Sequence, residues 1–168
     1  MQTKVAVPAG HKRLVATIIL KNGEQLLLLR RLKAPHQGLL CPVGGKLEPF
    51  ESPREAAIRE TLEETGLQVQ ELRFCGTLTE TSPLPNYNWL SFIYLAEIPY
   101  CEAPPCNEGQ LEWVPIADLE KAALPQGDIF IYTYALQQKP FMFNVRYDAA
   151  MQLLQYLEEF EHQEMVQR

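Results

Sequence analysis

Two apolar segments near the start of the chain are separated by a short polar turn. Residues 14–20 (LVATIIL) and 25–31 (QLLLLRR) are almost continuously hydrophobic, and residues 21–23 (KNG) lie between them. Apolar runs bounded by an Asn-Gly turn are typical of a β-hairpin, and the lack of polar alternation indicates strands that are buried on both faces. The pattern therefore predicts a hairpin in the core of a sheet.

The next segments predict a short strand and a well-bounded helix. LLCPV at residues 39–43 has the composition of a strand and leads into a Gly-Gly pair. Ser52 is a good helix N-cap, Pro53 suits the first helical position, and Glu55 completes a capping box. Gly66 is placed to end the helix in a left-handed turn.

The rest of the chain mixes strand-like and helix-like segments without a regular alternation. Strands are predicted at residues 71–80, 88–98, 111–115 and 141–147, helices at 116–124 and 127–138, and a loop at 100–109. Residues 151–165 fit either a continued hairpin or a helix. This order predicts an α+β fold with a mixed sheet between helices, in a single domain at residues 1–168.

Composition and charge narrow the classes of function. Of 168 residues, 46% are hydrophobic and 21% are charged, and the formal net charge is −6. A net negative charge argues against a nucleic-acid polymer as partner. The start lacks the apolar core of a signal peptide, and no run approaches the roughly 18–20 apolar residues of a membrane span. We expect a soluble, cytoplasmic protein without a membrane partner, either a monomer or a homodimer.

The cysteines and histidines form no recognisable metal motif. The four cysteines are irregularly spaced, and the three histidines are scattered. Without a secretory signal, this spacing indicates reduced thiols rather than disulfides, and it argues against a zinc site. The cysteines are Cys41, Cys75, Cys101 and Cys106.

The predicted helix concentrates carboxylates on one side. Glu60, Glu63 and Glu64 lie at i, i+3 and i+4, within an arc of about 100°. Ala56 and Ala57 lie one turn earlier on the same side. The opposite arc, expected to pack on the core, holds Ile58, Thr61, Leu62 and Thr65.

The acidic arc has an ordinary interpretation and a functional one. It could be a solvated face on which Arg59 pairs with Glu55 and Glu63 at i,i+4 spacing. However, these carboxylates lie towards the helix C-terminus, where the dipole disfavours them, and Glu60 repels Glu64. Clustered carboxylates on a rigid helix suit a hard divalent cation, Mg²⁺, for which Mn²⁺ can substitute.

At this point the sequence resembles a known family. Residues 45–67 contain Gly45, Glu51, the pairs Arg59-Glu60 and Glu63-Glu64, and Gly66. This spacing is similar to the signature of the Nudix hydrolases. Thr61 departs from it, because the family prefers an aliphatic residue there. The resemblance implies an α-β-α sandwich around a mixed sheet, and hydrolysis of a nucleoside diphosphate linked to another group.

The resemblance also implies roles for the residues of the signature. Glu60, Glu63 and Glu64 would hold metal ions, with the carbonyl of Gly44 or Gly45. Arg59 would hold Glu51 in place through a charge-assisted pair. Either Glu63 or Glu64 would take the proton of the attacking water, and we prefer Glu64.

Beyond the signature the chain resembles the bacterial MutT-type 8-oxo-dGTP diphosphatases. This implies that Glu108 reaches the metals from outside the helix, although a solvated loop charge is an equal alternative. Arg31 matches an arginine that binds phosphate or base, a role open also to Arg30 and Lys46.

Base recognition departs from the related mammalian enzymes. An asparagine and an aspartate pair that those enzymes use correspond here to Cys41 and to Gln126 with Gly127. Asp128 and Phe130 are the remaining candidates for contacting the base edge and for stacking. Phe50 also replaces a small residue of the catalytic loop, where its ring could alter access.

The sequence therefore predicts a Mg²⁺-dependent pyrophosphohydrolase that converts a nucleoside triphosphate to the monophosphate and pyrophosphate. The leading substrate is 8-oxo-dGTP or a related nucleotide, which implies a role in sanitising the nucleotide pool. One alternative is an ADP-ribose or nucleotide-sugar pyrophosphatase. Another, from a different class, is a regulatory module that binds a nucleotide without cutting it.

Overall fold

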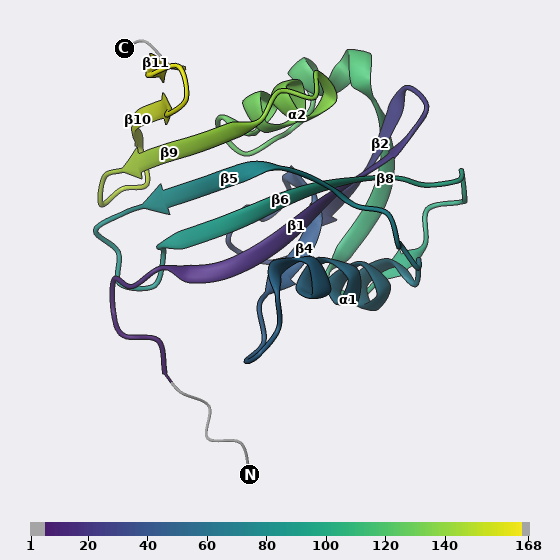
Figure 1. Ribbon diagram of the computed structural model, residues 1–168, viewed down its shortest axis with the longest axis horizontal. Coiled ribbons are helices and arrows are strands. Elements are labelled where there is room, and N and C mark those ends of the chain that lie inside the picture. The colour runs from purple at the N-terminus through teal and green to yellow at the C-terminus, as the bar shows by residue number, and fades with distance from the viewer. Residues whose placement is uncertain (1–5, 166–168) are drawn as a thin grey trace.

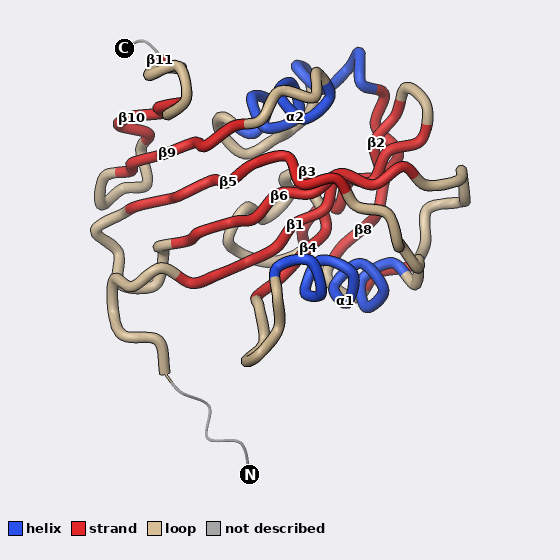
Figure 2. The backbone as a smooth tube through the Cα atoms, viewed as in Figure 1, coloured by secondary structure: helices blue, strands red, loops and turns tan. Residues whose placement is uncertain are grey.

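The structure is a computed structural model that describes residues 6–165, and its strands and helices follow one another along the chain as Figures 1 and 2 show. The strands are β1 (Arg13–Asn22), β2 (Gln25–Arg31), β3 (Leu40–Cys41), β4 (Val43–Lys46), β5 (Arg73–Thr81), β6 (Trp89–Glu97), β7 (Pro105–Cys106), β8 (Gly109–Pro115), β9 (Phe141–Tyr147), β10 (Leu153–Glu158) and β11 (Gln163–Glu164). The helices are α1 (Pro53–Thr65), the 3₁₀ helix η1 (Ile116–Lys121) and α2 (Asp128–Leu136).

These strands form one mixed sheet between two helices. The order is β11-β10-β9-β5-β6-β1-β2-β8-β7, with β3 beside β2 and β4 beside β1. The pairs β1–β6 and β5–β9 are parallel, and the other pairs are antiparallel. Figure 1 shows α1 and α2 on opposite sides of the sheet. The predicted mixed sheet between helices is confirmed.

The central strands are apolar on both faces because each face has its own core. In β1, Ile18 and Leu20 belong to the core beneath α1, whereas Ile19 belongs to the core beneath α2. In β2, Leu27 and Leu28 divide in the same way. The two cores explain the unbroken hydrophobic runs in the sequence.

Helix α1 has the predicted ends, and its packed face agrees in part with the predicted one. Ser52 and Glu55 form the capping box, and Gly66 ends the helix with φ 73°. The buried residues are Ala56, Ala57, Thr61, Glu64 and Thr65, whereas Leu62 is 45% exposed. Thr61 and Thr65 are therefore buried as predicted and Ile58 packs against the same core, but the packed face extends to Ala56, Ala57 and Glu64 instead of Leu62. The two alanines let the helix lie close to the sheet, which brings Glu64 into the interior.

Several other boundaries differ from the sequence-based expectation. The hairpin turn is at residues 23–24, because β1 extends to Asn22. The segment 39–43 is split between β3 and β4 at Pro42, which has no N–H to donate. The predicted loop at 100–109 contains β7, and the predicted helix at 116–124 is the 3₁₀ helix η1.

Three further features of the described residues concern the C-terminal segment, the cysteines and the helices. Residues 151–165 form the hairpin of β10 and β11 rather than a helix. The four cysteines are free thiols, as expected. Within residues 6–165, the helices are too short or too polar to span a bilayer. The ends of the predicted single domain, residues 1–5 and 166–168, lie outside the described residues.

The end of β10 is held by a buried carboxylate. Glu158 is fully buried and accepts hydrogen bonds from the backbone N–H groups of Met142 (3.3 Å), Phe160 (3.2 Å) and Glu161 (2.9 Å). Burial by itself raises the pKa of Glu158, but the three N–H donors outweigh it and leave this pKa below its usual value. The ionised carboxylate therefore stabilises the β10–β11 hairpin.

We expect Glu158→Gln to lower the free energy of unfolding at pH 7 by about 2 kcal/mol, because the amide accepts these hydrogen bonds less strongly. Since the folded pKa lies below the unfolded value of about 4.3, the contribution is complete above that value and is lost as pH falls through the folded pKa. Urea denaturation at pH 7 and at successively lower pH measures both effects.

Glu161→Gln is the matched control, since its exposed carboxylate forms an ordinary surface ion pair with Lys139. A loss in Glu158→Gln no larger than in this control would contradict the assignment.

Candidate active site

The candidate site is a cleft of about 530 Å³ on the α2 side of the sheet. Its lining comes from strands β1, β4, β5 and β6, from both helices, from the end of β2 and the loop that follows it, and from the turn between β7 and β8. Several predicted site residues line it together: Arg31, Gly44, Gly45, Lys46, Glu60, Glu108 and Asp128. The fold thus brings residues that are far apart in sequence to one cavity.

The glycines of β4 lie close to α1 on one side and to β1 on the other. A Cβ at Gly45 would lie 2.3 Å from the carboxylate of Glu60, and one at Gly44 would lie 2.3 Å from the carbonyl oxygen of Ala16. The N–H of Gly44 donates to Glu64 Oε2 at 3.0 Å. The glycine pair therefore lets the backbone touch two of the three predicted metal-binding carboxylates.

Without a cation, the ionised forms of the carboxylates that face β4 are electrostatically unfavourable. Burial raises the pKa of Glu64 to about 8, against the hydrogen bond from Gly44, and repulsion by Glu108 and Glu60 adds to the rise. Burial also raises the pKa of Glu60, which Arg59 opposes and which Glu63 and Glu108 reinforce. A cation among these groups would relieve the repulsion.

Arg59 holds the loop before α1 in place. Its Nε and Nη2 donate to the two carboxylate oxygens of Glu51 at 2.7 and 2.9 Å, and Nη2 also donates to the carbonyl of Lys46 at 3.0 Å. The hydrogen bond from Arg59 lowers the pKa of Glu51. Arg59 Nη1 contacts Glu60 at 2.8 Å and the more exposed Glu63 at 3.4 Å. This geometry suits the supporting role expected for Arg59 and Glu51.

The oxygen atoms of this site are suitable ligands for a divalent cation, although they are not arranged around a common point. In residues 6–165, no three His, Cys, Asp or Glu side chains are already arranged around a common point where a metal could bind. Glu60 is held by Arg59 instead, and Glu64 by the N–H of Gly44. Nevertheless, carboxylate oxygens that repel one another beside backbone carbonyls are the ligand types that Mg²⁺ prefers. Glu108 is well placed to join them, since its charge acts on both Glu60 and Glu64.

The three candidate cationic side chains have different partners in the structure. Arg30 is bound by both oxygens of Glu112, at 2.6 and 2.9 Å, which leaves Arg31 and Lys46 as the cleft-lining cations of the prediction. Arg31 Nε donates to the carbonyl of Pro35 at 2.9 Å. Lys46 Nζ lies 5.9 Å from the centre of the Trp89 ring.

The two residues expected to contact the base have different surroundings. Asp128 lines the cleft, and burial raises its pKa well above the usual value, with a further rise from Glu80. Phe130 lies against Tyr156, with ring centres 5.2 Å apart, and does not line the cleft. The geometry therefore does not support Phe130 as a stacking partner. Phe50 is wholly exposed and also lies outside the lining.

Sequence reasoning missed a group of residues around Glu80. This carboxylate lines the cleft and accepts hydrogen bonds from the hydroxyls of Tyr87 (3.1 Å) and Tyr147 (3.2 Å). One signal was available in the sequence, because Glu80 follows the buried Leu78 by two residues and so points to the same face of its strand. Tyr147 carried the same signal, because it follows the buried Val145 by two residues in β9, whereas Tyr87 lies in the loop before β6 and carried none.

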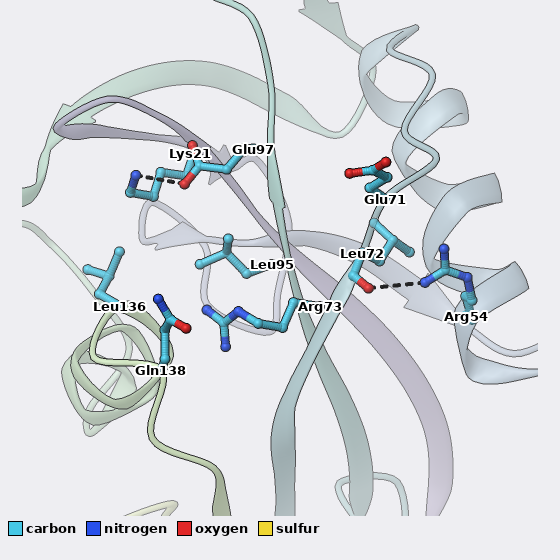
Figure 3. A pocket seen from close by; sticks show the side chains of 9 residues that line it. All are labelled: Lys21, Arg54, Glu71, Leu72, Arg73, Leu95, Glu97, Leu136 and Gln138. Carbon is cyan, nitrogen blue, oxygen red and sulfur yellow. Dashed lines mark hydrogen bonds and ion pairs between the residues drawn. The ribbon is translucent and has the colours of Figure 1, made fainter.

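A second cleft, of about 640 Å³, lies at the other end of the strands (Figure 3). Its arginines are occupied by the backbone: Arg54 donates to the carbonyls of Gln70 and Leu72, and Arg73 to that of Ala135. Lys21 is paired with Glu97 at 2.8 Å. These contacts join β5 to the two helices, so we assign this cleft a structural role.

Comparison with known proteins identifies close parallels. A family model described as "NUDIX domain" matches residues 11–133. The uncharacterised Nudix hydrolase YvcI of Bacillus subtilis is 26% identical over 147 residues, which are 84% of this chain and 91% of that protein. A putative 8-oxo-dGTP diphosphatase of the same organism is 47% identical over 49 residues, 29% of this chain and 31% of that protein.

Among solved structures, the MutT protein of Bacillus halodurans superposes with a TM-score of 0.77 at 26% identity. The match covers 88% of this chain and 97% of that one. The similarity therefore extends well beyond the helix that carries the glutamates.

We expect the buried Glu64 to make stability depend on pH in buffer that contains a chelator. Because its folded pKa of about 8 lies above the unfolded value of about 4.3, the folded state keeps a proton that the unfolded state loses in this range. Stability should therefore fall as pH rises from 5 to 8, and Glu64→Gln, which cannot titrate, should reduce that fall. Thermal unfolding across this range measures it.

Glu63→Gln is the control, because the side chain of Glu63 is 58% exposed. Parallel curves of melting temperature against pH for the parent and Glu64→Gln would refute the expectation.

Proposed function

The chain belongs to the NUDIX domain family and is a hydrolase, and from this premise we propose that it cleaves a nucleoside triphosphate to the monophosphate and pyrophosphate, with 8-oxo-dGTP as the leading substrate. One observation carries the proposal: a single cleft joins Glu60 of α1, the Gly-Gly segment of β4 and Glu108 to a partly apolar recess between β5, β6 and α2. A nucleotide has the same division, since its phosphates are charged and its base is largely flat and apolar. The similarity to the MutT protein of Bacillus halodurans supports the proposal of a nucleotide substrate.

The residues around β4 would act on the phosphates. Arg31 and Lys46 line the cleft and would bind phosphate oxygens. When bound, Mg²⁺ held by Glu60, Glu63, Glu64 and Glu108 with the carbonyl of Gly44 or Gly45 would neutralise the charge that develops on the phosphates. Arg59 and Glu51 would keep the Gly-Gly segment and the helix in register.

The proton of the attacking water needs an acceptor in the same place. Glu64 is buried and its Oε2 accepts a hydrogen bond from the N–H of Gly44, which fixes the carboxylate beside the residues that would hold the metal. Glu63 is more exposed and is paired with Arg59. We therefore assign the general base to Glu64 in preference to Glu63.

The substrate is the finer part of the proposal. The match to a putative 8-oxo-dGTP diphosphatase spans 49 residues, so it supports the chemistry more than the choice of base. ADP-ribose or a nucleotide sugar stays the alternative substrate class. Retention of Glu60, Glu63 and Glu64 argues for catalysis over a regulatory module that only binds a nucleotide. A cytoplasmic location and the oligomeric state stay predictions.

We expect purified protein with Mg²⁺ to release pyrophosphate from 8-oxo-dGTP with a kcat/KM at least about tenfold above that for dGTP, a difference of about 1.4 kcal/mol in transition-state binding. The panel should include the other triphosphates, ADP-ribose and ADP-glucose. Equal rates for all triphosphates would remove the sanitising role, and activity on ADP-ribose alone would favour the alternative.

We expect Glu64→Gln to lower kcat by roughly 10²–10⁴-fold, the usual contribution of a general base. Glu60→Gln should instead raise the Mg²⁺ concentration required for half-maximal activity. Glu55→Gln, in the first turn of the same helix, is the control and should retain activity close to that of the parent. Substantial turnover by Glu64→Gln would shift the general base to another residue.

A further inference from the structure

Two carboxyl groups on the β5 side of the cleft have acceptor atoms without protein donors. Glu80 Oε1 accepts from Tyr87 and Tyr147, at 3.1 and 3.2 Å. Within residues 6–165, neither Glu80 Oε2 nor the carboxyl oxygens of Asp128 receive a hydrogen bond, although both residues line the cleft. The cleft thus presents three acceptor atoms that a bound molecule could use.

The position of Glu80 is held from several directions. The Tyr87 ring meets Trp89 and Tyr147 edge to face, with ring centres 6.2 and 6.0 Å apart. The Tyr87 hydroxyl gives its single proton to Glu80, so at 3.1 Å it accepts from His36 Nε2. Lys12 Nζ donates to the backbone carbonyl of Glu80 at 2.7 Å and anchors the end of β5. The free oxygen of Glu80 is therefore well oriented before any ligand binds.

Burial affects both carboxyl groups in the free protein. Burial raises the pKa of Glu80, against its hydrogen bonds from Tyr87 and Tyr147. Burial and the charge of Glu80 likewise raise the pKa of Asp128. An acceptor that is partly removed from water is stabilised when it gains a donor. A ligand that brings N–H donors would therefore stabilise these carboxylates.

The acceptor set discriminates among nucleobases. Guanine presents N1–H beside its 2-amino group, two adjacent donors that the free oxygen Oε2 of Glu80 can accept, one on each lone pair, and 8-oxoguanine adds a donor at N7. Adenine and cytosine place a ring-nitrogen acceptor beside their amino group, which a carboxylate repels. Trp89, Ile131 and Leu78 supply apolar walls for a flat ring.

We propose that Glu80, positioned by Tyr87 and Tyr147, is the residue that selects a guanine-type base by accepting its adjacent N–H groups. Asp128 supplies further acceptor atoms in the same recess. This assignment rests on the proposed hydrolysis of nucleoside triphosphates, and it names the class of base that the cleft takes. Glu80 contacts the base, whereas the two tyrosines act through Glu80.

The test compares Glu80→Gln with Glu97→Gln, the same change on the neighbouring strand at the far end of the sheet. We expect Glu80→Gln to lower kcat/KM for dGTP and 8-oxo-dGTP at least roughly 30-fold, mainly through KM, because an amide presents donors to the base donors. The values for dATP and dCTP should change less than about threefold. Tyr147→Phe, which removes one positioning hydrogen bond, should give a smaller loss that is also confined to guanine nucleotides.

An equal loss for all bases, or no loss, would overturn the proposal. Should Glu80→Gln fail to fold, the base dependence of Tyr147→Phe decides in its place. Calorimetric binding of dGMP and dAMP separates this proposal from the proposed reaction, because it requires no hydrolysis. Selective dGMP binding that Glu80→Gln abolishes, in a protein that cleaves no triphosphate, would keep the base site and refute the reaction. If the protein cleaves triphosphates and Glu80→Gln lowers kcat/KM equally for all bases, the proposed reaction stands and the base site is refuted.

Discussion

The close contact between α1 and the glycine strand β4 governs the arrangement of the catalytic side of the cleft. A side chain at Gly45 would overlap the carboxylate of Glu60 in its present position, so the glycine leaves room for that carboxylate. The contact also requires small residues on the helix, which Ala56 and Ala57 provide. Both conditions bring the backbone of β4 and the carboxylates of α1 within hydrogen-bonding distance, as the bond between Gly44 and Glu64 shows.

This arrangement places function in conflict with stability. Buried, mutually repelling carboxylates towards the C-terminal end of a helix are unfavourable in the absence of a cation. Arg59 offsets part of the cost, because its planar guanidinium binds Glu51 through two hydrogen bonds and Glu60 through a third. One arginine therefore both secures the loop before α1 and compensates the charge of the cluster.

The cleft contains two groups of carboxylates with different surroundings. Glu60 and Glu108 line the cleft and Glu64 is bonded to the N–H of Gly44, and the repulsion among these like charges suits a cation. Glu80 and Asp128 lie among aromatic and aliphatic side chains, where free acceptor atoms suit N–H donors. Because the sheet holds both groups in one cavity, a nucleotide could use the first with its phosphates and the second with its base.

The sequence by itself determined the ends of α1, the spacing of its glutamates and the double burial of β1 and β2, because caps, periodicity and hydrophobic runs act over a few residues. It did not determine the whole packed face of α1, since the small Ala56 and Ala57 proved better buried than Leu62. Nor could it assemble Glu80 with Tyr147, which are 67 residues apart in the chain. Only the tertiary structure decided those contacts, because they depend on how the strands are ordered in the sheet.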